Sequence, residues 1–563
     1  MTRLLRSLLA GFWPAPLAAG LLMAAAFPPL DLGFLAPLAW ALLLASMRVR
    51  RGARAGRQGF VAGLCLFLPG LHWMQPLMDG GWLFSAAWCA LFPAALGWFV
   101  GRVWLARERA GWVVGAALVQ LACDGVRTYA LSGFPWLLPG YTGWRNPVLL
   151  GSAGLLGVHG ATLAVLLLGG GIAEALVRRL EARPRPVGAL VPAAVWWGAL
   201  ALFAALAPAP AERPGPTLAL LQGNVPQKLK HQVLANATPA EIRDYQRKNL
   251  LAWWQSYEAL ADEVREGPRG REVDVVVWPE TMVPPQPYVA WRDLPRSAPL
   301  WERLAELSGG AQTLAGVVLE DDLGRQWNSV VLLDAEGRPV AAQDKQHLTP
   351  GGEYVPYVGL LPRAFRAWLE ARLREFAGFV PELVAGDGNT LLPVRGRTGV
   401  ARAGVLICYE SVFPEIARGM VRDGADFLLN ASNYGWFEGT AEMDQALAMA
   451  CFRAAELGVP VALSSNNGHS TVIGADGRPR AFATGAAGRT TDVRACLVAE
   501  VPLGGRATPF RTWGEWPAWG LGLVGLALGL AGRGGPWRRA SGAFGSGSGD
   551  AGSERAEGVG KSS

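Results

Sequence analysis

The sequence of 563 residues is longer than one ordinary hydrophobic core supports, so two or more domains are expected. Hydrophobic residues make up 51% of the chain and charged residues only 17%, which favours a membrane protein over a soluble one. The formal charge of +7 does not indicate a nucleic-acid partner, because the arginines occur in short runs beside apolar stretches and form no basic face on a soluble domain.

The apolar residues crowd the first 206 positions, where segments long enough to cross about 30 Å of hydrocarbon recur. We predict a transmembrane helical bundle of eight spans, seven of them within residues 1–206. The spans cover residues 8–27, 34–47, 60–77, 82–100, 112–131, 148–176, 187–206 and 513–531. The first also has the basic start of a signal peptide, but Pro28 and Pro29 do not suit a cleavage site, so a retained span is preferred.

Arginines predict the orientation of these spans, because cytoplasmic loops collect Lys and Arg. Arginine clusters precede the first predicted span and follow the second, fourth, sixth and eighth. The other loops carry little positive charge, with Arg145 as the main exception. The large segment between the seventh and eighth spans is therefore predicted to lie outside the cytoplasm.

A proline-rich linker at 207–216 leads into a segment, 217–505, in which strand and helix patterns alternate. Strands are predicted at 218–222, 273–277, 313–319, 329–333, 403–407, 427–430, 459–463 and 470–473, and helices at 239–264, 298–307 and 439–457. The turns Glu336-Gly337 and Asp476-Gly477 predict hairpins. This mixture indicates an α/β sandwich. The final span, placed within 513–532, is followed by a Gly- and Ser-rich tail at 533–563 that is predicted to be disordered.

Several ligand classes leave no signal in the sequence. The glycines at 169–171 lie inside an apolar span without a following Lys-Ser or Lys-Thr, so close helix packing explains them better than phosphate binding. The five histidines show no ligand spacing, and no pair of cysteines forms a metal motif. Neither a metal nor a cofactor is expected.

Three reactive side chains stand out, two of them just after predicted strands and one before a turn. Cys408 directly follows the buried run 403–407, Glu280 follows 273–277, and Lys345 precedes a Gly-Glu turn. A thiol needs a base before it attacks a carbonyl, and the resulting oxyanion needs a fixed cation. Each residue alone would be taken as a buried thiol or a solvated charge. Together they supply the parts for covalent acyl transfer.

The order of these residues resembles the nitrilase superfamily, and most closely its membrane-bound branch, the bacterial apolipoprotein N-acyltransferases. The motifs that carry the resemblance are Gly-Phe-Pro-Trp at 133–136, Leu-Gln-Gly-Asn-Val-Pro-Gln at 221–227, Trp-Pro-Glu at 278–280, Pro-Gly-Gly-Glu-Tyr-Val-Pro at 350–356, Cys-Tyr-Glu at 408–410 and Ser-Asn-Tyr-Gly-Trp-Phe at 432–437. The similarity runs over nearly the whole chain except the tail after Gly532. It implies an extracytoplasmic, nitrilase-like α-β-β-α sandwich beside the bundle.

The resemblance also implies roles for individual residues. It gives a catalytic triad of Glu280, Lys345 and Cys408, supporting roles to Glu353, Tyr409 and Glu410, and substrate contacts to Asn433, Trp436 and His231. The residues alone leave a surface-charge role open for Glu353 and Glu410. Departures from the family's common residues at His231, Gly351, Tyr434 and Asp124 concern the lipid entrance more than the chemistry.

The implied activity is N-acylation of the N-terminal diacylglyceryl cysteine of an apolipoprotein. A membrane phospholipid would be the acyl donor and a thioester on Cys408 the intermediate, in a multi-pass protein of the bacterial inner membrane with a periplasmic catalytic domain. No nucleic acid is expected, and a monomer is favoured. Two alternatives stay open: a membrane-anchored nitrilase-type amidase that uses water as acceptor, and a non-enzymatic lipid-binding scaffold.

Overall fold

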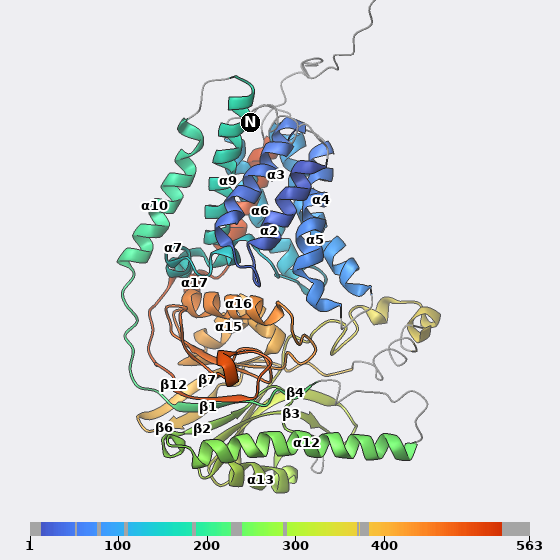
Figure 1. Cartoon of the computed structure of the whole chain (residues 1–563), viewed down its shortest axis with the longest axis vertical. Helices are drawn as coiled ribbons and strands as arrows, with labels where there is room; N and C mark the ends of the chain where they lie inside the picture. The colour runs from blue at the N-terminus through green and yellow to red at the C-terminus, as the bar shows by residue number, and fades with distance from the viewer. Residues whose placement is uncertain are drawn as a thin grey trace, which may run out of the picture.

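The computed structural model describes residues 9, 13–50, 53–75, 80–105, 111–182, 187–226, 239–284, 290–368, 371 and 382–531. Helices make up the described chain before residue 207, and two β-sheets with their covering helices make up most of the chain after residue 216. The helical part lies at one end of the molecule and the sheets lie at the other (Figure 1).

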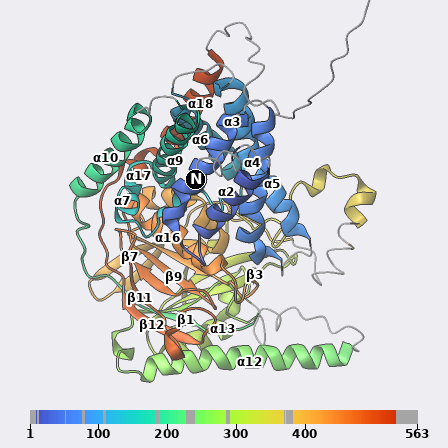
Figure 2. The same cartoon turned by 45° about the horizontal axis from the view of Figure 1, so that its top comes forward.

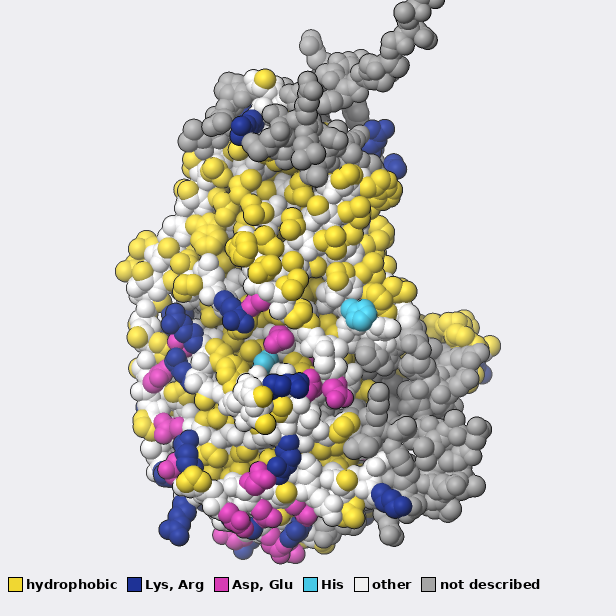
Figure 3. Space-filling view, viewed as in Figure 1, with side chains coloured by type: hydrophobic (Ala, Val, Ile, Leu, Met, Phe, Trp, Pro, Cys, Tyr) yellow, Lys and Arg dark blue, Asp and Glu magenta, His cyan; other side chains and the backbone are white. Residues whose placement is uncertain are grey.

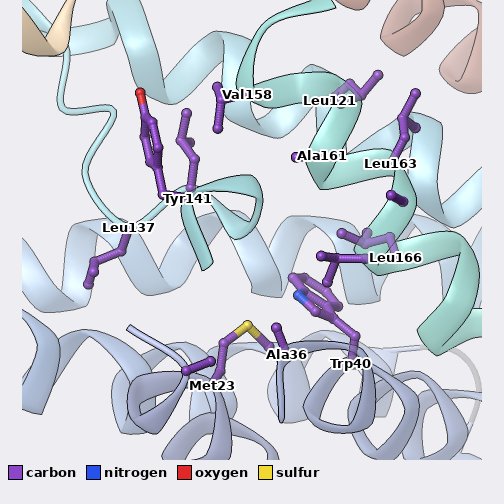
Figure 4. Close-up of a cluster of buried hydrophobic side chains, with 14 of the residues drawn as sticks. Met23, Ala36, Trp40, Leu121, Leu137, Tyr141, Val158, Ala161, Leu163 and Leu166 are labelled. Atoms are coloured by element: carbon purple, nitrogen blue, oxygen red, sulfur yellow. The ribbon is translucent and has the colours of Figure 1, made fainter. Parts of the chain in front are cut away.

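The helical part is a bundle with a continuous apolar core. Its longer helices are α2 (Pro14–Ala25), α3 (Ala36–Arg50), α4 (Ala53–Gly70), α5 (Gly81–Phe99), α6 (Trp112–Tyr129), α9 (Val158–Leu180), α10 (Val191–Leu206) and α18 (Trp516–Ala531). Met23, Trp40 and Leu166, from α2, α3 and α9, are at most 3% exposed and belong to one buried cluster (Figure 4). The C-terminal helix α18 packs on α6, so residues far apart in sequence close the bundle.

The glycine run in α9 packs closely against neighbouring segments, as predicted. A Cβ added at Gly169 would lie 2.7 Å from the Pro37 carbonyl oxygen, and one at Gly170 would lie 2.5 Å from a methyl carbon of Val113. Both distances are below any real Cβ contact, so only glycine allows α9 to approach so closely.

The predicted span at 148–176 is wrong in its first third. Residues before 158 form two short helices, α7 (Pro147–Gly151) and α8 (Ala153–Leu156), and a continuous helix begins only at Val158. The break falls at Gly157, whose φ of +62° cannot continue a right-handed helix. The apolar side chains of α8 pack against α16 of the sandwich as well as against α9 of the bundle.

Two helices are long and apolar enough to cross a membrane by length and composition, Gly81–Leu105 and Val158–Leu180. The shorter apolar helices are Pro14–Ala25, Gly33–Val49, Val191–Leu206 and Trp516–Ala531. The prediction of eight spans therefore stays a prediction. Figure 3 adds that, on the face drawn, hydrophobic side chains dominate the helical end while charged side chains gather at the other end.

Two six-stranded sheets form the centre of the second part. The first sheet has the order β12-β1-β2-β3-β4-β5, with β1 Thr217–Gln222, β2 Val275–Trp278, β3 Gln312–Glu320, β4 Gln326–Leu333, β5 Pro339–Asp344 and β12 Ala495–Glu500. The second has the order β11-β10-β9-β8-β7-β6, with β6 Leu392–Gly396, β7 Gly399–Ile407, β8 Phe427–Ser432, β9 Val461–Ser465, β10 Thr471–Ile473 and β11 Pro479–Phe482. All eight predicted strands and both hairpins are confirmed. Strands β5 and β11 were implied only as the second strands of the hairpins, and β6 and β12 were not predicted.

The sheets and their helices form four layers. Between the sheets lies a core of interdigitating apolar side chains, including Val277 from β2 and Val405 from β7, both fully buried. Helices α12 (Pro239–Glu266) and α13 (Ala298–Ser308) cover the outer face of the first sheet (Figure 2). Helices α15 (Pro414–Arg422) and α16 (Glu442–Leu457) cover the second sheet and separate it from the bundle. The predicted α-β-β-α sandwich is confirmed.

A single glutamine fixes α16 to the bundle. The Gln445 carbonyl oxygen accepts hydrogen bonds from the indole nitrogens of Trp73 and Trp136, at 3.2 and 2.6 Å. Its amide nitrogen donates to the carbonyl oxygens of Pro28 and Gly70, both at 3.2 Å. Four hydrogen bonds on one buried side chain specify how the sandwich sits on the bundle.

Candidate active site

The reactive residues stand at the ends of strands from both sheets. Lys345 directly follows β5, Cys408 directly follows β7, and Asn433 directly follows β8, while Glu280 comes two residues after β2. The backbone N–H of Asn433 donates to Glu280 Oε2 at 2.9 Å, which joins the strand ends of the two sheets. The site therefore lies where the two sheets meet at one edge.

Lys345 is the buried cation of the site. Its ammonium lies 2.8 Å from Glu353 Oε2, 3.3 Å from Glu280 Oε1 and 3.3 Å from the Thr349 hydroxyl, and the side chain is only 1% exposed. Burial alone would favour the neutral amine, but Glu353 and then Glu280 outweigh it and raise the pKa of Lys345 above its usual value. Lys345 thus stays positively charged and cannot act as a base.

Asn328, in β4, holds the two carboxylates beside this cation. Its amide nitrogen donates to Glu280 Oε1 and to Glu353 Oε1, both at 2.8 Å. Glu353 Oε2 also accepts from the backbone N–H of Thr349 at 2.7 Å. Against the effect of burial, the Lys345 charge and these donors hold the pKa of Glu353 below its usual value. The surface-charge alternative for Glu353 is therefore wrong.

Cys408 begins the short 3-10 helix Cys408–Val412 with a backbone φ of +52°. This left-handed conformation costs a non-glycine residue on the order of 1 to 3 kcal/mol and turns the thiol out of the strand direction. Burial, reinforced by the negative charge of Glu280, raises the pKa of the Cys408 thiol well above its usual value, although Lys345 opposes the shift. The resting sulfur is therefore a protonated thiol, and attack requires a proton acceptor.

Glu410 joins the nucleophile turn to the loop that carries Lys345. Its Oε1 accepts from the backbone N–H groups of Gln346 and His347, at 2.7 and 3.1 Å, and its Oε2 accepts from Ile407 at 2.7 Å. The side chain is fully buried, so the surface-charge alternative is wrong here too. Burial raises the pKa of Glu410 to about 7, although these three donors favour the carboxylate.

Glu410→Ala is expected to destabilise the protein by about 3 kcal/mol or more, because up to three backbone N–H groups lose their acceptor at about 1 to 3 kcal/mol each. Thermal unfolding of the purified protein measures the change. Glu266→Ala, which removes a carboxylate whose side chain is 76% exposed, is the matched control and should have little effect. Equal unfolding temperatures for the two variants would exclude this role for Glu410.

The bundle contributes one loop to the rim of the site. Leu131, Ser132 and Gly133 all have positive φ, between 54° and 79°. The Gly133 carbonyl accepts from the Tyr409 hydroxyl at 2.8 Å, and the Ser132 hydroxyl lies 2.5 Å from that of Tyr354. The residue after the nucleophile is therefore anchored to the helical part, and the catalytic loops face the bundle.

The remaining predicted residues lie in different settings. Asn433 is 6% exposed and bonds to Glu280 through its backbone, while its side-chain oxygen accepts from Asn466 at 3.1 Å. In the structure, the backbone of Asn433 therefore positions the Glu280 carboxylate. Trp436 is half-buried in the loop after β8, and His231 lies outside the described residues.

Sequence reasoning missed Asn328. It belongs to no motif, and the predicted strand 329–333 begins one residue after it. The only signal was an amide next to an otherwise apolar strand. Its partners come from the segments that follow β2 and β5, so its role depends on how β2, β3, β4 and β5 align across the first sheet.

Comparison with known proteins identifies the family. Residues 19–171 match the model for the apolipoprotein N-acyltransferase N-terminal domain, and residues 231–504 match the carbon-nitrogen hydrolase model. An apolipoprotein N-acyltransferase from Photobacterium profundum is 30% identical over 534 residues, covering 91% of this chain and 93% of the relative. The chain belongs to the apolipoprotein N-acyltransferase family. A relative with that name from Azotobacter vinelandii is 33% identical over 545 residues, covering 92% and 95% of the two chains.

The two matched regions of this apolipoprotein N-acyltransferase family member correspond to most of the bundle and to most of the sandwich. A solved carbon-nitrogen hydrolase from Helicobacter pylori is 17% identical, with a TM-score of 0.34, covering 51% of this chain and 89% of that one. The predicted family resemblance is confirmed, and with it the nitrilase-like fold of the C-terminal part.

Proposed function

We propose that this protein transfers an acyl chain from a membrane phospholipid to the α-amine of the N-terminal diacylglyceryl cysteine of an apolipoprotein. The observation that carries the proposal is the buried Lys345 ammonium, held by Glu280 and Glu353 within electrostatic reach of Cys408. Family membership supplies the substrate class, since the relatives are named apolipoprotein N-acyltransferases.

In the first half-reaction, Glu280 takes the proton of the Cys408 thiol, and the sulfur attacks the ester carbonyl of the phospholipid. The tetrahedral oxyanion is stabilised by the fixed positive charge of Lys345. The ester C–O bond breaks, Glu280 returns its proton to the leaving alkoxide, and lysophospholipid departs. A thioester remains on Cys408. Glu353 and Asn328 keep Lys345 and Glu280 in place throughout.

In the second half-reaction, the neutral α-amine of the acceptor attacks the thioester carbonyl. Lys345 again stabilises the oxyanion, the C–S bond breaks, and an amide forms. Glu280 takes one amine proton and passes it to the departing sulfur, so the free thiol is regenerated. No external oxidant, reductant or cofactor is consumed in either step.

The proposed organisation joins this chemistry to a bilayer. It comprises a bundle at 1–206, a linker at 207–216, a catalytic domain at 217–505, a final span within 513–532 and a cytoplasmic tail at 533–563. The anchoring of Tyr409 to the loop of Ser132 and Gly133 supports access from the lipid side. A tethered site avoids a search for two lipid substrates through bulk water.

From the arginine distribution we expect residues 217–505 to lie on the periplasmic side of a bacterial inner membrane. Protease added to intact spheroplasts should cut the catalytic domain and spare a tag placed after Ser563. Lysed spheroplasts, in which both are cut, serve as the control. Protection of the domain together with loss of the tag would reverse the orientation.

The transfer itself is expected to be ping-pong. Enzyme incubated with phospholipid alone should release lysophospholipid and keep a hydroxylamine-sensitive adduct on Cys408, about one per protein. A diacylglyceryl peptide with a free N-terminal amine should then discharge the adduct, and the same peptide with a blocked amine should not.

Three other results would decide against this scheme. Lysophospholipid that appears only when acceptor is present, without any adduct, favours direct transfer in a ternary complex. Rapid hydrolysis of the thioester without acceptor favours a membrane-anchored amidase that uses water. No reaction with any phospholipid favours a lipid-binding scaffold.

A further inference from the structure

A buried carboxyl group beside the nucleophile has no role in the scheme above. Glu442, in the first turn of α16, is only 3% exposed. Its Oε2 atom is buried and has no hydrogen-bond partner among the described residues. Buried carboxyl oxygens are nearly always bonded, because the desolvation of an unpaired one costs free energy. An unpaired oxygen of this kind is therefore a candidate for contact with a ligand.

Residues next to Glu442 on α16 pack with the nucleophile. Met443, which directly follows Glu442, and Ala446, one turn later, form a small buried cluster with Tyr434, and Cys408 packs against this cluster. The Glu442 carboxylate interacts electrostatically with both the Cys408 thiol and the Tyr434 hydroxyl. A ligand bound at the sulfur beside this cluster thus lies near Glu442.

No cation compensates Glu442 within the described part of the chain. The charged group that acts on it is Asp444 of the same helix, which is like-charged and itself lies 2.9 Å from His469. Cys408 and Tyr434 face it from the neighbouring loops, and both become negative when they ionise. Lys345, the cation of the site, is held by Glu280 and Glu353. Burial and Asp444 raise the pKa of Glu442 well above its usual value.

An uncompensated buried carboxylate binds either a proton or a cation. According to the proposed function, the acceptor brings one cation to this site. That cation is the α-ammonium of its N-terminal cysteine. An α-amino group has a pKa of about 7.7 to 8.0, so it is mostly protonated near neutral pH and cannot attack. It must lose a proton before it becomes a nucleophile, and a buried carboxylate of raised pKa accepts that proton readily.

We propose that Glu442 binds the α-ammonium of the acceptor and takes one of its protons, and so delivers the neutral amine to the thioester. This inference rests on the proposed function. The proton balance is complete: the resting Glu442 carboxyl is neutral and releases its proton to solvent as the α-ammonium pairs with it. Within that ion pair, R–NH₃⁺ and the Glu442 carboxylate become R–NH₂ and a neutral Glu442. The amine nitrogen then attacks, its second proton leaves through Glu280, and the thiol is regenerated. The ester donor brings no proton to remove, so the first half-reaction does not need Glu442.

Glu442→Gln separates the two half-reactions. The variant is loaded with a phospholipid whose headgroup lacks an amine, and its thioester is then discharged with a diacylglyceryl peptide over a range of pH. We expect lysophospholipid release close to that of the unmodified enzyme. We expect peptide discharge to fall about 10-fold or more near neutral pH and to recover as pH rises, because the amine must then deprotonate in solution. Hydroxylamine, which is neutral at this pH, should discharge both enzymes equally.

Two further variants sharpen the test. Glu302→Gln makes the same carboxylate-to-amide change at an exposed position of α13, away from the site, and should match the unmodified enzyme. Glu442→Asp keeps the carboxyl group and should restore part of the peptide discharge, with a pH profile close to that of the unmodified enzyme.

Other results overturn the inference. Peptide discharge with an unchanged rate and pH profile in Glu442→Gln excludes the role, and an equal loss in both half-reactions and with hydroxylamine indicates packing alone. If the unmodified enzyme forms no thioester, the proposed function fails, and this inference with it. If Glu442→Gln does not accumulate in membranes, the pH dependence of thioester discharge by the unmodified enzyme tests the inference. A discharge rate that follows only the neutral fraction of the free peptide amine overturns the proposal.

Discussion

Cys408→Ala is expected to abolish acyl-enzyme formation and lysophospholipid release. The sulfur is the proposed nucleophile, and no other atom at this strand end can form a thioester. The fold should survive, because alanine meets the same left-handed φ of +52° and loses only the sulfur contacts with the small cluster of Tyr434, Met443 and Ala446. Mass spectrometry of protein incubated with phospholipid measures the adduct, and thermal unfolding measures the fold.

Two other free cysteines in the sandwich provide the matched controls. Cys451 is fully buried in α16, and Cys496 lies in β12, where burial raises its pKa to about 12. Neither belongs to the cluster of Lys345, Glu280 and Glu353. Cys451→Ala and Cys496→Ala should keep the adduct at about one per protein. An adduct that persists in Cys408→Ala but disappears in one of the controls would move the nucleophile to that residue.

The positions of Glu280 and Cys408 in the fold could be predicted from the sequence because each follows a predicted strand, whereas Lys345 was singled out by its motif and lies at the end of β5, for which no strand range was predicted. An apolar run that breaks into polar residues predicts the end of a strand. The order of such runs can be read from a single sequence. The strand ends of a layered sandwich meet at one edge of its sheets. Three motifs that are separate in the sequence therefore predict a single site. The structure brings these residues within reach of one another.

The partners of these residues could not be predicted in the same way. Asn328 bonds to Glu280 and Glu353 only because β4 lies between β3 and β5 in the particular register observed. Glu410 looks like a surface charge in sequence, and its three backbone donors come from the segment after β5 and from the end of β7, which are far apart in the sequence. Hydrogen bonds between distant segments depend on tertiary alignment, which hydropathy does not encode.

The error in the span at 148–176 has a related cause. Hydropathy averages over a window, and the apolar residues of α7 and α8 contact α16 of the sandwich in addition to bundle helices. The backbone break at Gly157 adds a turn that composition does not reveal. Directly after Gly157, the backbone N–H of Val158 donates to the side chain of Glu456 in α16 at 2.8 Å. This hydrogen bond fixes the N-terminal end of α9 on the sandwich. An apolar segment at the junction of two domains is thus easily mistaken for part of a membrane span.

Lys345→Met is expected to leave the Cys408 thiol in place and to reduce turnover about 100-fold or more, equivalent to about 2.7 kcal/mol. Two effects add. The oxyanion loses its fixed cation, and the carboxylates of Glu280 and Glu353, both bonded to one Asn328 amide, lose the charge between them. One of them then takes a proton, because two uncompensated carboxylates cannot both stay ionised. Single-turnover release of lysophospholipid measures the loss, and thiol titration after denaturation counts Cys408.

A double variant separates chemistry from folding in this prediction. Lys345→Met with Glu353→Gln removes the cation together with one carboxylate, so the charge imbalance of the buried cluster is relieved. We expect this pair to recover much of the thermal stability lost in Lys345→Met but none of the turnover, since the oxyanion still lacks its cation. Lys248→Met, at an exposed position in α12, controls for the loss of a lysine. If the double variant regained turnover along with stability, Lys345 would serve only to balance charge, and the oxyanion would have to be stabilised by another group.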